Sequence, residues 1–343
     1  MFELADAEAA IGGRPAVLAQ GIAAAAAVLG GAAAPVIAGL RTDAAGAVAA
    51  VALARRLGAV LDHADSAAAL RDLDAMRIAG WIVTTPAQAR ALADLFFVVG
   101  DPAPDVLAAL ALDRPPPLDA EQRPRRVLRI AADAALTSRL GLLRALVKRR
   151  EVAGPNDLAM LAEALAAARY GVVVWSAAQL PPLAIEMLCG LIEDLNAATR
   201  FAGLPLPAPG NAAGVAQALG WETGFPLRVA FRDGVPRHDP VHYDAARMVT
   251  SGEADAVLWL DALGDGPPPW QTPVKLVALA PAGARFASAP DVAIAVGRPG
   301  IDHVGALFHP VAFALLAARP TAPLPRPTAA DLLGRIQAAL PSC

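Results

Sequence analysis

The chain has 343 residues, enough for about two ordinary domains, and it is 56% hydrophobic and 18% charged, which excludes a disordered protein. Its formal net charge of -3 argues against a nucleic-acid-binding protein, because such proteins carry basic patches that neutralise phosphates. Two cysteines, Cys189 and Cys343, are too few for a disulfide framework or for a metal site built from cysteines.

The first notable segment is Ala16–Leu40, which contains no charged residue. A membrane-spanning helix needs about 20 consecutive apolar residues. This segment is interrupted by Gly30-Gly31 and by Pro35, and it consists largely of Ala and Gly. We therefore expect a buried helix, a turn and a strand over Pro35–Gly39. The first charges of the chain, Glu3, Asp6 and Glu8, are acidic, unlike those of an export signal, so we expect a cytoplasmic protein.

Short runs rich in Val, Ile and Leu alternate with longer Ala/Leu segments of helical spacing, among them Asp43–Leu57 and Ala87–Ala93. The expected strands are Pro35–Gly39, Ala59–Asp62, Gly80–Thr84, Leu95–Val99, Arg126–Ala131, Gly171–Trp175, Arg228–Phe231, Ala256–Leu260, Lys275–Ala280 and Asp291–Val296. Apolar strands that alternate with helices predict an α/β fold with sheets covered on both faces.

Proline-rich and glycine-rich segments predict the loops. Asp113–Arg126 reads as an exposed loop or a crossover between sheets, and Gly264–Pro269 as a loop after a strand. Arg319–Pro327 precedes a last helix over Thr328–Leu340, for which Thr328 is a suitable N-cap. We expect a first domain formed by residues 1–125 and 275–343, and a second formed by 126–274.

The common motifs of enzymes are missing: no GxGxxG follows a strand, and neither a GxxxxGK[ST] loop nor a GxSxG elbow is present. His238 and His242 have the i, i+4 spacing of zinc ligands, but Pro240 lies between them, so we favour a turn. Asp62-His63-Ala64-Asp65 follows a strand and offers groups that could bind a cation, although a solvated turn is favoured.

Two further candidates carry little chemistry. Asp302-His303 resembles an acid–histidine dyad, but no Ser or Cys nucleophile can be placed beside it. Cys189 lies in an apolar helical stretch and is expected to be inert, and Cys343 is the last residue. The sequence thus offers no catalytic, cofactor-binding or metal-binding residue.

The central part of the chain holds four Gly- and Pro-containing segments. They are Asn211-Ala-Ala-Gly214, Trp221-Glu-Thr-Gly-Phe-Pro226, Gly234-Val-Pro-Arg-His-Asp-Pro240, and Ser251-Gly-Glu-Ala-Asp-Ala-Val-Leu-Trp-Leu260. Such loops either line a cleft or connect two half-sheets, and the residues alone leave both alternatives open.

These segments, in this order and at similar spacing, resemble the B subunit of formylmethanofuran dehydrogenase from about Arg14 to the end of the chain. The resemblance implies two Rossmann-like parallel or mixed sheets flanked by helices, as in the core domains of molybdopterin oxidoreductases. That family opens with a cysteine cluster for a [4Fe–4S] centre, which has no counterpart here. It also places a metal-ligating Cys-His pair where this chain has Ala68-Ala69, and a methyl group cannot bind molybdenum or tungsten.

The departures point to a metal-free form of this subunit, as in the formyltransferase/hydrolase complex of methylotrophic bacteria. The resemblance implies a complex that moves formyl groups from tetrahydromethanopterin to a methanofuran-like carrier and releases formate. It implies a formyltransferase subunit, a zinc amidohydrolase-like hydrolase subunit and one further small subunit as partners. We then expect a non-catalytic scaffold with no molybdenum or tungsten pterin, no [4Fe–4S] cluster, no nucleic acid and no membrane. The former cleft near Ser66–Ala69 is expected to be filled.

Two alternatives stay open at this stage. One is a small-molecule oxidoreductase or transferase that uses the loops around Asn211, Trp221 and Arg237, with Arg237 either paired to an anionic group or buried as a structural residue. The other is a module that binds the acidic tail of the carrier through a basic patch, although a solvated loop is favoured over the patch. The patch would contain Arg123, Arg125, Arg126 and Arg129.

Overall fold

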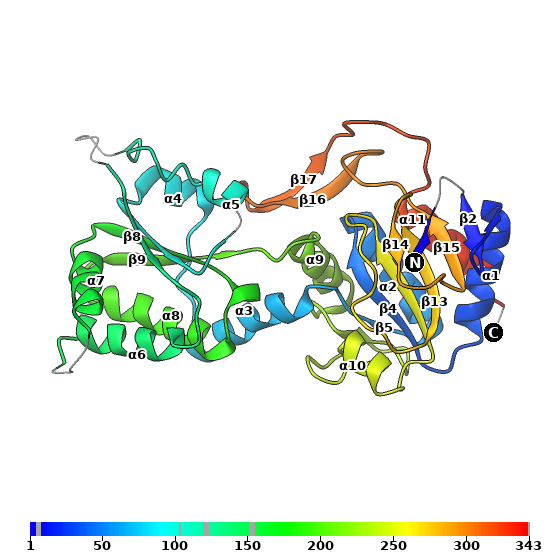
Figure 1. The fold of residues 1–343 in the computed structure, drawn as a ribbon, viewed down its shortest axis with the longest axis horizontal. Coiled ribbons are helices and arrows are strands. Elements are labelled where there is room, and N and C mark those ends of the chain that lie inside the picture. The colour runs from blue at the N-terminus through cyan, green and yellow to red at the C-terminus, as the bar shows by residue number, and fades with distance from the viewer. Residues whose placement is uncertain (5–7, 103, 119–123, 151–154, 342–343) are drawn as a thin grey trace. The chain divides into compact units, whose positions relative to one another are not determined.

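The computed structural model describes residues 1–4, 8–102, 104–118, 124–150 and 155–341. The chain divides into two compact units, and it passes from one to the other more than once (Figure 1). Unit 1 contains Met1–Ser66, Pro209–Phe308 and Leu315–Cys343. Unit 2 contains Ala67–Ala208 and His309–Ala314.

The main sheet of unit 1 is mixed and has the strand order β11-β10-β5-β4-β12-β13-β15-β2-β3. The central strands β5, β4, β12, β13 and β15 are parallel to one another, whereas β10, β11, β2 and β3 pair antiparallel at the two sides. In chain order the strands are β2 (Ala9–Ile11), β3 (Arg14–Ala16), β4 (Pro35–Arg41), β5 (Val60–Leu61), β10 (Val229–Ala230), β11 (Arg237–His238), β12 (Ala256–Asp261), β13 (Lys275–Ala280) and β15 (Val292–Ala295).

Helices α1 (Leu18–Gly30), α11 (Ala329–Ala339), α2 (Ala44–Leu57) and α9 (Ala212–Thr223) pack side by side in that order on one face of this sheet. The other face is covered by α10 (Ala245–Thr250), with the small antiparallel pair β1 (Phe2–Glu3) and β14 (Arg285–Phe286) contributing to the same hydrophobic core. The central strands are apolar on both sides because each face of the sheet packs against a hydrophobic layer.

Unit 2 contains a parallel sheet of order β7-β6-β8-β9. Its strands are β6 (Leu95–Val99), β7 (Arg126–Ile130), β8 (Tyr170–Ser176) and β9 (Arg200–Leu206). One core contains side chains of α3 (Ser66–Ala79), α6 (Leu136–Val147), α7 (Asn156–Ala166) and α8 (Pro182–Leu195). A second core, on the other face of the sheet, contains side chains of α4 (Pro86–Leu92) and α5 (Pro104–Ala108). The 3-10 helix Ala177–Gln179 follows β8.

A two-stranded sheet, β16 (Gly305–His309) and β17 (Ala314–Ala318), completes the architecture. The expected α/β fold with parallel or mixed sheets and flanking helices is confirmed. The charge-free Ala16–Leu40 segment forms α1 and most of β4, as expected. None of the helices in the described ranges combines the length and hydrophobicity that a bilayer crossing requires.

Most local predictions are confirmed, including the loop over Gly264–Pro269 and the N-cap of the last helix. The Thr328 hydroxyl accepts a hydrogen bond from the Asp331 backbone N–H at 3.1 Å. The predicted strand Gly80–Thr84 is wrong. Gly80, at a φ of +75°, follows the end of α3, and only an isolated bridge joins Val83 to Gly203 in the described chain. Part of the predicted loop Asp113–Arg126, residues 119–123, lies outside the described residues.

The predicted domain boundaries differ from the two units. Strand β6 pairs with β7 and β8, so residues 67–125 belong with the second unit rather than the first. Strand β12 pairs with β4 and β13, so residues 209–274 belong with the first unit. The prediction assumed that the strands of one sheet come from neighbouring parts of the sequence. Strand β4 instead pairs with β12, which lies more than 200 residues later.

Candidate functional site

The clearest concentration of charged and polar side chains lies at the carboxyl edge of the unit 1 sheet. Arg41 ends β4, Asp62 follows β5, and Asp261 ends β12. The carboxyl ends of parallel strands are where open α/β sheets bind their ligands. A ligand site of unit 1 would therefore be expected at this edge.

Asp62 and Arg228 form a buried ion pair at this edge, with 3.4 Å between Asp62 Oδ1 and Arg228 Nε. Arg228 Nε also donates to the Ser66 hydroxyl at 3.1 Å, and the guanidinium binds the Asp244 carboxylate and the Pro240 carbonyl. Asp62 Oδ2 accepts from the Ala245 backbone N–H at 2.9 Å. Each of the three guanidinium nitrogens of Arg228 thus donates to a group of its own chain.

Burial raises the pKa of Asp62 to about 6, against the opposing effects of Arg228 and the Ala245 N–H. Burial thus outweighs the neighbouring guanidinium, which by itself would lower the pKa of the carboxyl. A catalytic acid would need to face a substrate, but both Asp62 oxygens are engaged within the protein. We therefore interpret the pair as structural.

A second ion cluster lies beside the first. Arg41 contacts Asp65 at 3.0 Å and Asp261 at 3.4 Å. Burial lowers the pKa of Arg41, but the two carboxylates outweigh it and the net pKa is raised. Burial raises the pKa of Asp261 in spite of Arg41 and the Gly264 N–H. Together the two clusters set the guanidinium groups of Arg41 and Arg228 against four carboxylates at this end of the sheet.

His63 is fully buried between these clusters and is uncharged. Its Nδ1 accepts from the Asp65 backbone N–H at 3.0 Å, so its Nε2 carries the proton and donates to the Gly210 carbonyl at 3.0 Å. Burial lowers its pKa to about 4. The expectation of a solvated turn over Asp62–Asp65 is therefore wrong, because the turn closes on buried partners that are far away in the sequence.

Asn211 is a structural clamp at the same edge. It adopts a left-handed backbone with a φ of +63°, which Asn tolerates better than most residues. Its Nδ2 donates to the Thr42 carbonyl at 2.7 Å, and its Oδ1 accepts from the Phe308 N–H at 2.8 Å. Both the Nδ2 and the Oδ1 of Asn211 are thus engaged by backbone groups of the same chain.

The other two residues of the enzyme alternative lie at the surface. The Trp221 side chain is 69% exposed at the end of α9. Arg237 is exposed and pairs with Asp233, so the expectation of a buried structural arginine is wrong at this position. Arg228 occupies that role instead.

The histidines of the other two candidate motifs have local partners. His238 Nδ1 bonds to the Leu227 carbonyl at 2.7 Å, and His242 Nδ1 contacts Asp239 Oδ2 at 2.9 Å, so the favoured turn is confirmed. His303 bonds to the Val304 and Gly297 carbonyls, whereas Asp302 accepts from the Arg298 N–H. The Asp302 and His303 side chains thus have separate backbone partners.

The arginines suggested for carrier binding differ in their surroundings. Arg125 donates to the Ala93 carbonyl at 3.1 Å and lies over the Phe96 ring, with 5.5 Å from its Cζ to the ring centroid. Arg126 and Arg129 are exposed on β7, and Arg123 lies outside the described residues. Arg125 therefore tethers a loop.

Unit 2 contains a half-buried carboxyl and a buried thiol near one another. Asp72 on α3 accepts from Trp175 Nε1 at 2.9 Å, and burial raises the pKa of this carboxyl to about 7. Cys189 on α8 is buried in the same core, and burial raises its pKa to about 11. The core position of Cys189 agrees with the predicted packing role, and a raised pKa leaves little of the thiolate that acts as a nucleophile. Cys343 lies outside the described residues.

The donors needed for a molybdenum or tungsten pterin do not fit this chain. Ala68 and Ala69, where the resemblance places the Cys-His pair, are on α3, and the Ala68 methyl group belongs to the core of unit 2. Cys189, the cysteine within the described residues, is also in that core. Over the same residues, no group of three or more His, Cys, Asp or Glu side chains is placed to hold a metal ion.

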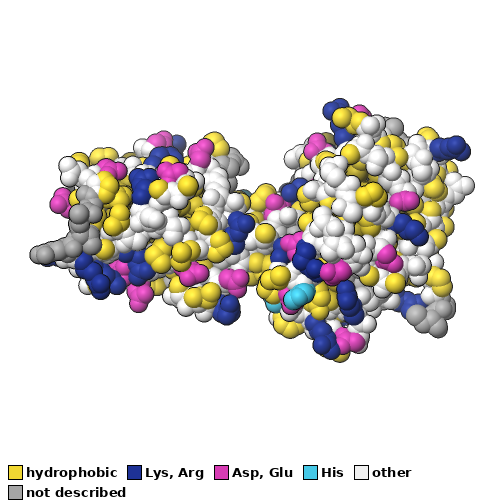
Figure 2. Space-filling view, turned by 60° about the horizontal axis from the view of Figure 1, so that its bottom comes forward, with side chains coloured by type: hydrophobic (Ala, Val, Ile, Leu, Met, Phe, Trp, Pro, Cys, Tyr) yellow, Lys and Arg dark blue, Asp and Glu magenta, His cyan; other side chains and the backbone are white. Residues whose placement is uncertain are grey.

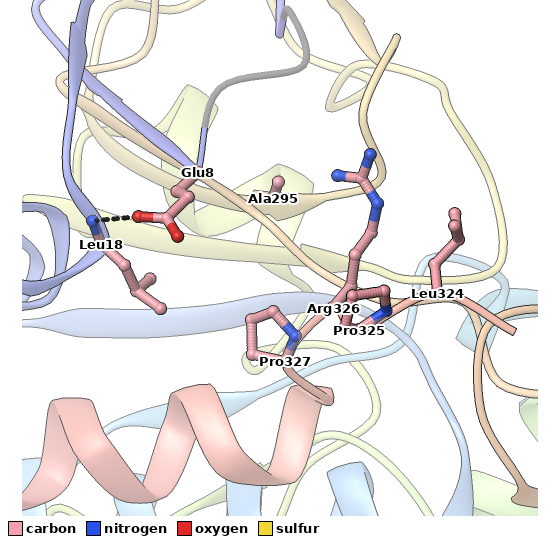
Figure 3. A pocket seen from close by; sticks show the side chains of 7 residues that line it. All are labelled: Glu8, Leu18, Ala295, Leu324, Pro325, Arg326 and Pro327. Atoms are coloured by element: carbon pink, nitrogen blue, oxygen red, sulfur yellow. Dashed lines mark hydrogen bonds between the residues drawn. The ribbon is translucent and has the colours of Figure 1, made fainter.

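One small cavity of about 250 Å³ opens in unit 1 at the carboxyl end of β15 (Figure 3). It is lined by Glu8, Leu18, Ala295, Leu324, Pro325, Arg326 and Pro327. Glu8 accepts from the Leu18 backbone N–H at 3.1 Å and thereby occupies the start of α1. The Glu8 and Arg326 side chains lie on either side of Ala295 and do not point toward each other, so they form no acid–base pair.

Sequence reasoning missed Arg228, Asp261 and Asp72. A signal for Arg228 was present, because it stands in the apolar run Leu227-Arg228-Val229-Ala230. A charge inside a buried strand requires a partner. Asp72 gave no comparable signal, since it lies among the charged residues of an amphipathic helix.

Comparisons with known proteins identify relatives of this chain. No protein-family profile matches the sequence. The B subunit of the formyltransferase/hydrolase complex Fhc of Methylorubrum extorquens is 35% identical over 325 residues, which cover 88% of this chain and 90% of the relative. The B subunit of the tungsten-containing formylmethanofuran dehydrogenase 2 of Methanocaldococcus jannaschii is 38% identical over 74 residues, 22% of this chain and 17% of that protein.

A solved structure supports the same relationship. It is the crystal structure of the formyltransferase/hydrolase complex FhcABCD from Methylorubrum extorquens with methylofuran. One of its chains matches with a TM-score of 0.88 and 35% identity, over 96% of this chain and 98% of that chain.

Proposed function

Because the chain belongs to the family of the B subunit of the formyltransferase/hydrolase complex, we propose that it is a non-catalytic scaffold subunit of such a complex. The single observation that carries the proposal is the closure of the unit 1 sheet edge. There, Arg228 and Arg41 are occupied by Asp62, Asp65 and Asp261 of the same chain.

The absence of cofactors is part of the proposal. The alanines at the Cys-His positions and the burial of Cys189 support a chain without molybdenum or tungsten pterin and without a [4Fe–4S] cluster. The complex would move formyl groups from tetrahydromethanopterin to a methanofuran-like carrier and release formate. Neither transfer nor hydrolysis is a redox reaction, so a subunit without a redox metal suits this chemistry.

The proposed partners are a formyltransferase subunit, a zinc amidohydrolase-like hydrolase subunit and one further small subunit, assembled in the cytoplasm. A scaffold needs permanent interfaces, which are rich in apolar side chains. Large apolar side chains are exposed on both units, among them Trp221 and Val241 in unit 1 and Met160 and Ile78 in unit 2. Figure 2 shows hydrophobic side chains interspersed with charged ones on the face in view.

The helices of unit 1 support partner binding further. Helix α1 has no charged residue over its 13 positions, and α2 has only Arg55 and Arg56, in its last turn. Residues such as Ala23 on α1 and Val48 on α2 are nevertheless exposed. A helix with an uncharged outer face is typically covered, whereas a solvated helix carries charge there.

The proposal is tested by purifying the native chain with a tag and identifying what co-purifies. We expect a zinc amidohydrolase-like subunit and a formyltransferase subunit at fixed stoichiometry, with formyl transfer and hydrolysis found in the assembly. The isolated chain, assayed with the formylated carrier, should show neither activity. Elution of a lone, active monomer would contradict the scaffold role.

Metal analysis provides a second test. The purified chain is soaked with molybdate or tungstate and a pterin cofactor, and bound metal is measured after gel filtration. We expect no stoichiometric metal. One equivalent retained per chain would overturn the cofactor-free part of the proposal without affecting membership of the complex.

A further inference from the structure

The chain passes between its two units at four places, which follow Ser66, Ala208, Phe308 and Ala314. Beside each of the first three, a side chain of unit 1 binds the connecting segment. These side chains belong to Arg228, His63 and Asn211. The fourth passage belongs to β17, which pairs with β16. The anchoring of these connections within unit 1 is independent of the proposed scaffold role.

At the first passage, Ser66 is the last residue of unit 1 and the first of α3. Its hydroxyl accepts from Arg228 Nε at 3.1 Å, and its backbone N–H donates to the His63 carbonyl at 3.0 Å. Both Ser66 and Arg228 are buried. The start of the connecting helix is therefore fixed from inside unit 1.

At the second passage, the chain returns to unit 1 at Pro209 and is bound one residue later. His63 Nε2 donates to the Gly210 carbonyl at 3.0 Å. Gly210 has a φ of +65°, and a Cβ there would lie 2.6 Å from the Arg41 side chain. Backbone geometry and packing thus leave this position to glycine.

At the third passage, Phe308 is the last residue of unit 1 before the β16–β17 turn. Its N–H donates to Asn211 Oδ1 at 2.8 Å, while Asn211 Nδ2 donates to the Thr42 carbonyl at 2.7 Å. One amide therefore joins the second and third passages to the end of β4.

We propose that the carboxyl edge of β4 and β5 is the base of a hinge, where Arg228, His63 and Asn211 fix the directions in which the connections leave unit 1. An edge that binds ligands in other α/β proteins serves here to orient the chain's own crossings. Hinges consist of a few residues at element ends, and a rigid base confines bending to the segments beyond it. Loss of an anchor should widen the range of inter-unit distances without unfolding either unit.

The test measures inter-unit distances by double electron–electron resonance in the full chain. Spin labels are placed on Ala338→Cys in α11 and Met160→Cys in α7, both at exposed positions, with Cys343→Ser to remove a competing thiol. Asn211→Ala should widen the distance distribution about twofold or more relative to the labelled parent.

A matched control exists in unit 2. Asn196 clamps its surroundings in the same way, with Nδ2 donating to the Ile192 and Phe201 carbonyls and Oδ1 accepting from the Phe201 N–H. Asn196→Ala removes an equivalent amide whose partners all lie within unit 2, and it should leave the distribution unchanged. Equal widening in both variants would overturn the proposal, because the effect would then be general loosening.

Ser66→Ala provides a second anchor variant in case Asn211→Ala does not fold, as judged by circular dichroism. It removes only the hydroxyl that binds Arg228. We expect it to widen the distribution less than Asn211→Ala does. A folded Ser66→Ala variant with the parent's distribution, together with an unchanged or unfolded Asn211→Ala variant, would refute the hinge base.

Discussion

The two units solve the same problem at the carboxyl edges of their parallel sheets in different ways. In unit 1 the edge contains ion pairs, with Arg228 and Arg41 as the cations. In unit 2 a neutral amide bridges the corresponding edge, because Gln179 accepts from the Asp101 N–H at 2.9 Å and donates to the Asp101 carbonyl at 2.7 Å. The ionic edge is the one beside which the connections between units are held.

Two aspartates that are removed from solvent to different degrees show the same contrast. Asp62 in unit 1 faces a guanidinium, whereas Asp72 in unit 2 is bound by the neutral indole of Trp175. Removing a charged partner and removing an unpaired charge should therefore have opposite effects on stability. The comparison teaches that burial of a carboxyl does not by itself indicate an active site, since structural networks also shift pKa values.

The largest effect is expected for Arg228→Met. The change leaves Asp62 and Asp244 without their cation in a buried site, and such losses cost about 3–5 kcal/mol. The free energy of unfolding should be measured by urea denaturation.

The matched variant in unit 2 is Arg144→Met. Arg144 pairs with the buried Asp194 at 2.7 Å, but Lys148 contacts the same carboxylate and would remain. We expect a loss of about 1–2 kcal/mol, close to that of one charge-assisted hydrogen bond. Similar losses in the two variants would break the distinction between the units.

The second effect is a gain in stability for Asp72→Asn. The native pKa of Asp72 is about 7, above its ordinary value of 3.8, so the native protein holds more protons than the unfolded chain between these values. The contribution of Asp72 to the free energy of unfolding therefore falls as the pH rises from about 4 to about 7. Asn is uncharged and its Oδ1 can still accept from Trp175, so the variant should gain about 2 kcal/mol at pH 8.

The measurement is thermal unfolding at pH 5 and pH 8 for the parent and for Asp72→Asn. The parent should lose more stability between the two pH values than the variant does. Asp62→Asn is the control, because it removes the partner of Arg228 and should destabilise at pH 8. An Asp72→Asn variant that is less stable than the parent at pH 8 would show that the carboxylate is stabilised by more than the indole.

The sequence was sufficient for much of the fold but not for the site. The buried strands could be predicted because a short, fully apolar run such as Leu95–Val99 is typical of a strand covered on both faces. The domain boundaries could not, since they depend on β12 pairing with β4 across two-thirds of the chain. The roles of His63 and Asp62 could not be predicted either, because their partners Gly210 and Arg228 are distant in sequence.

The family resemblance supplied what local patterns could not. The composition of the segments around Asn211 and Trp221 does not indicate a function. Their order along the chain nevertheless indicated the family that the comparisons then showed. The resemblance did not reveal that Asn211 clamps backbone groups while Trp221 is exposed. One motif therefore contains side chains with quite different surroundings.

A third prediction concerns the outer helix faces, which differ between the units. Helix α7 of unit 2 carries Asp157 and Glu163, whereas α2 has no charge before its last turn. Val48→Glu places a charge on the outer face of α2 and should weaken binding to partner subunits about tenfold, because a charge must be desolvated at an interface. Recovery of partners in a pull-down, with binding measured by titration, checks this.

Met160→Glu on α7 is the control for Val48→Glu, since it adds the same charge to an already charged helix at an exposed position. It should leave partner recovery close to that of the parent. Both variants should keep the parent's melting temperature. If Met160→Glu alone disrupts assembly, the partner face is on unit 2 and the interpretation of the uncharged helices is wrong.

The smallest effect is expected at the helix caps, where the two units share the same chemistry. The Thr328 hydroxyl accepts from the Asp331 N–H at 3.1 Å in unit 1, and the Thr85 hydroxyl accepts from the Gln88 N–H at 3.2 Å in unit 2. Replacing either threonine with alanine removes one such bond and costs about 1 kcal/mol. Because α11 packs against both α1 and α2, the Thr328→Ala loss should appear in global urea unfolding. The short helix α4 can fray locally, so Thr85→Ala should instead increase hydrogen exchange at the Gln88 amide and change global unfolding less. Equal losses of global stability would show that α4 unfolds only together with the rest of unit 2.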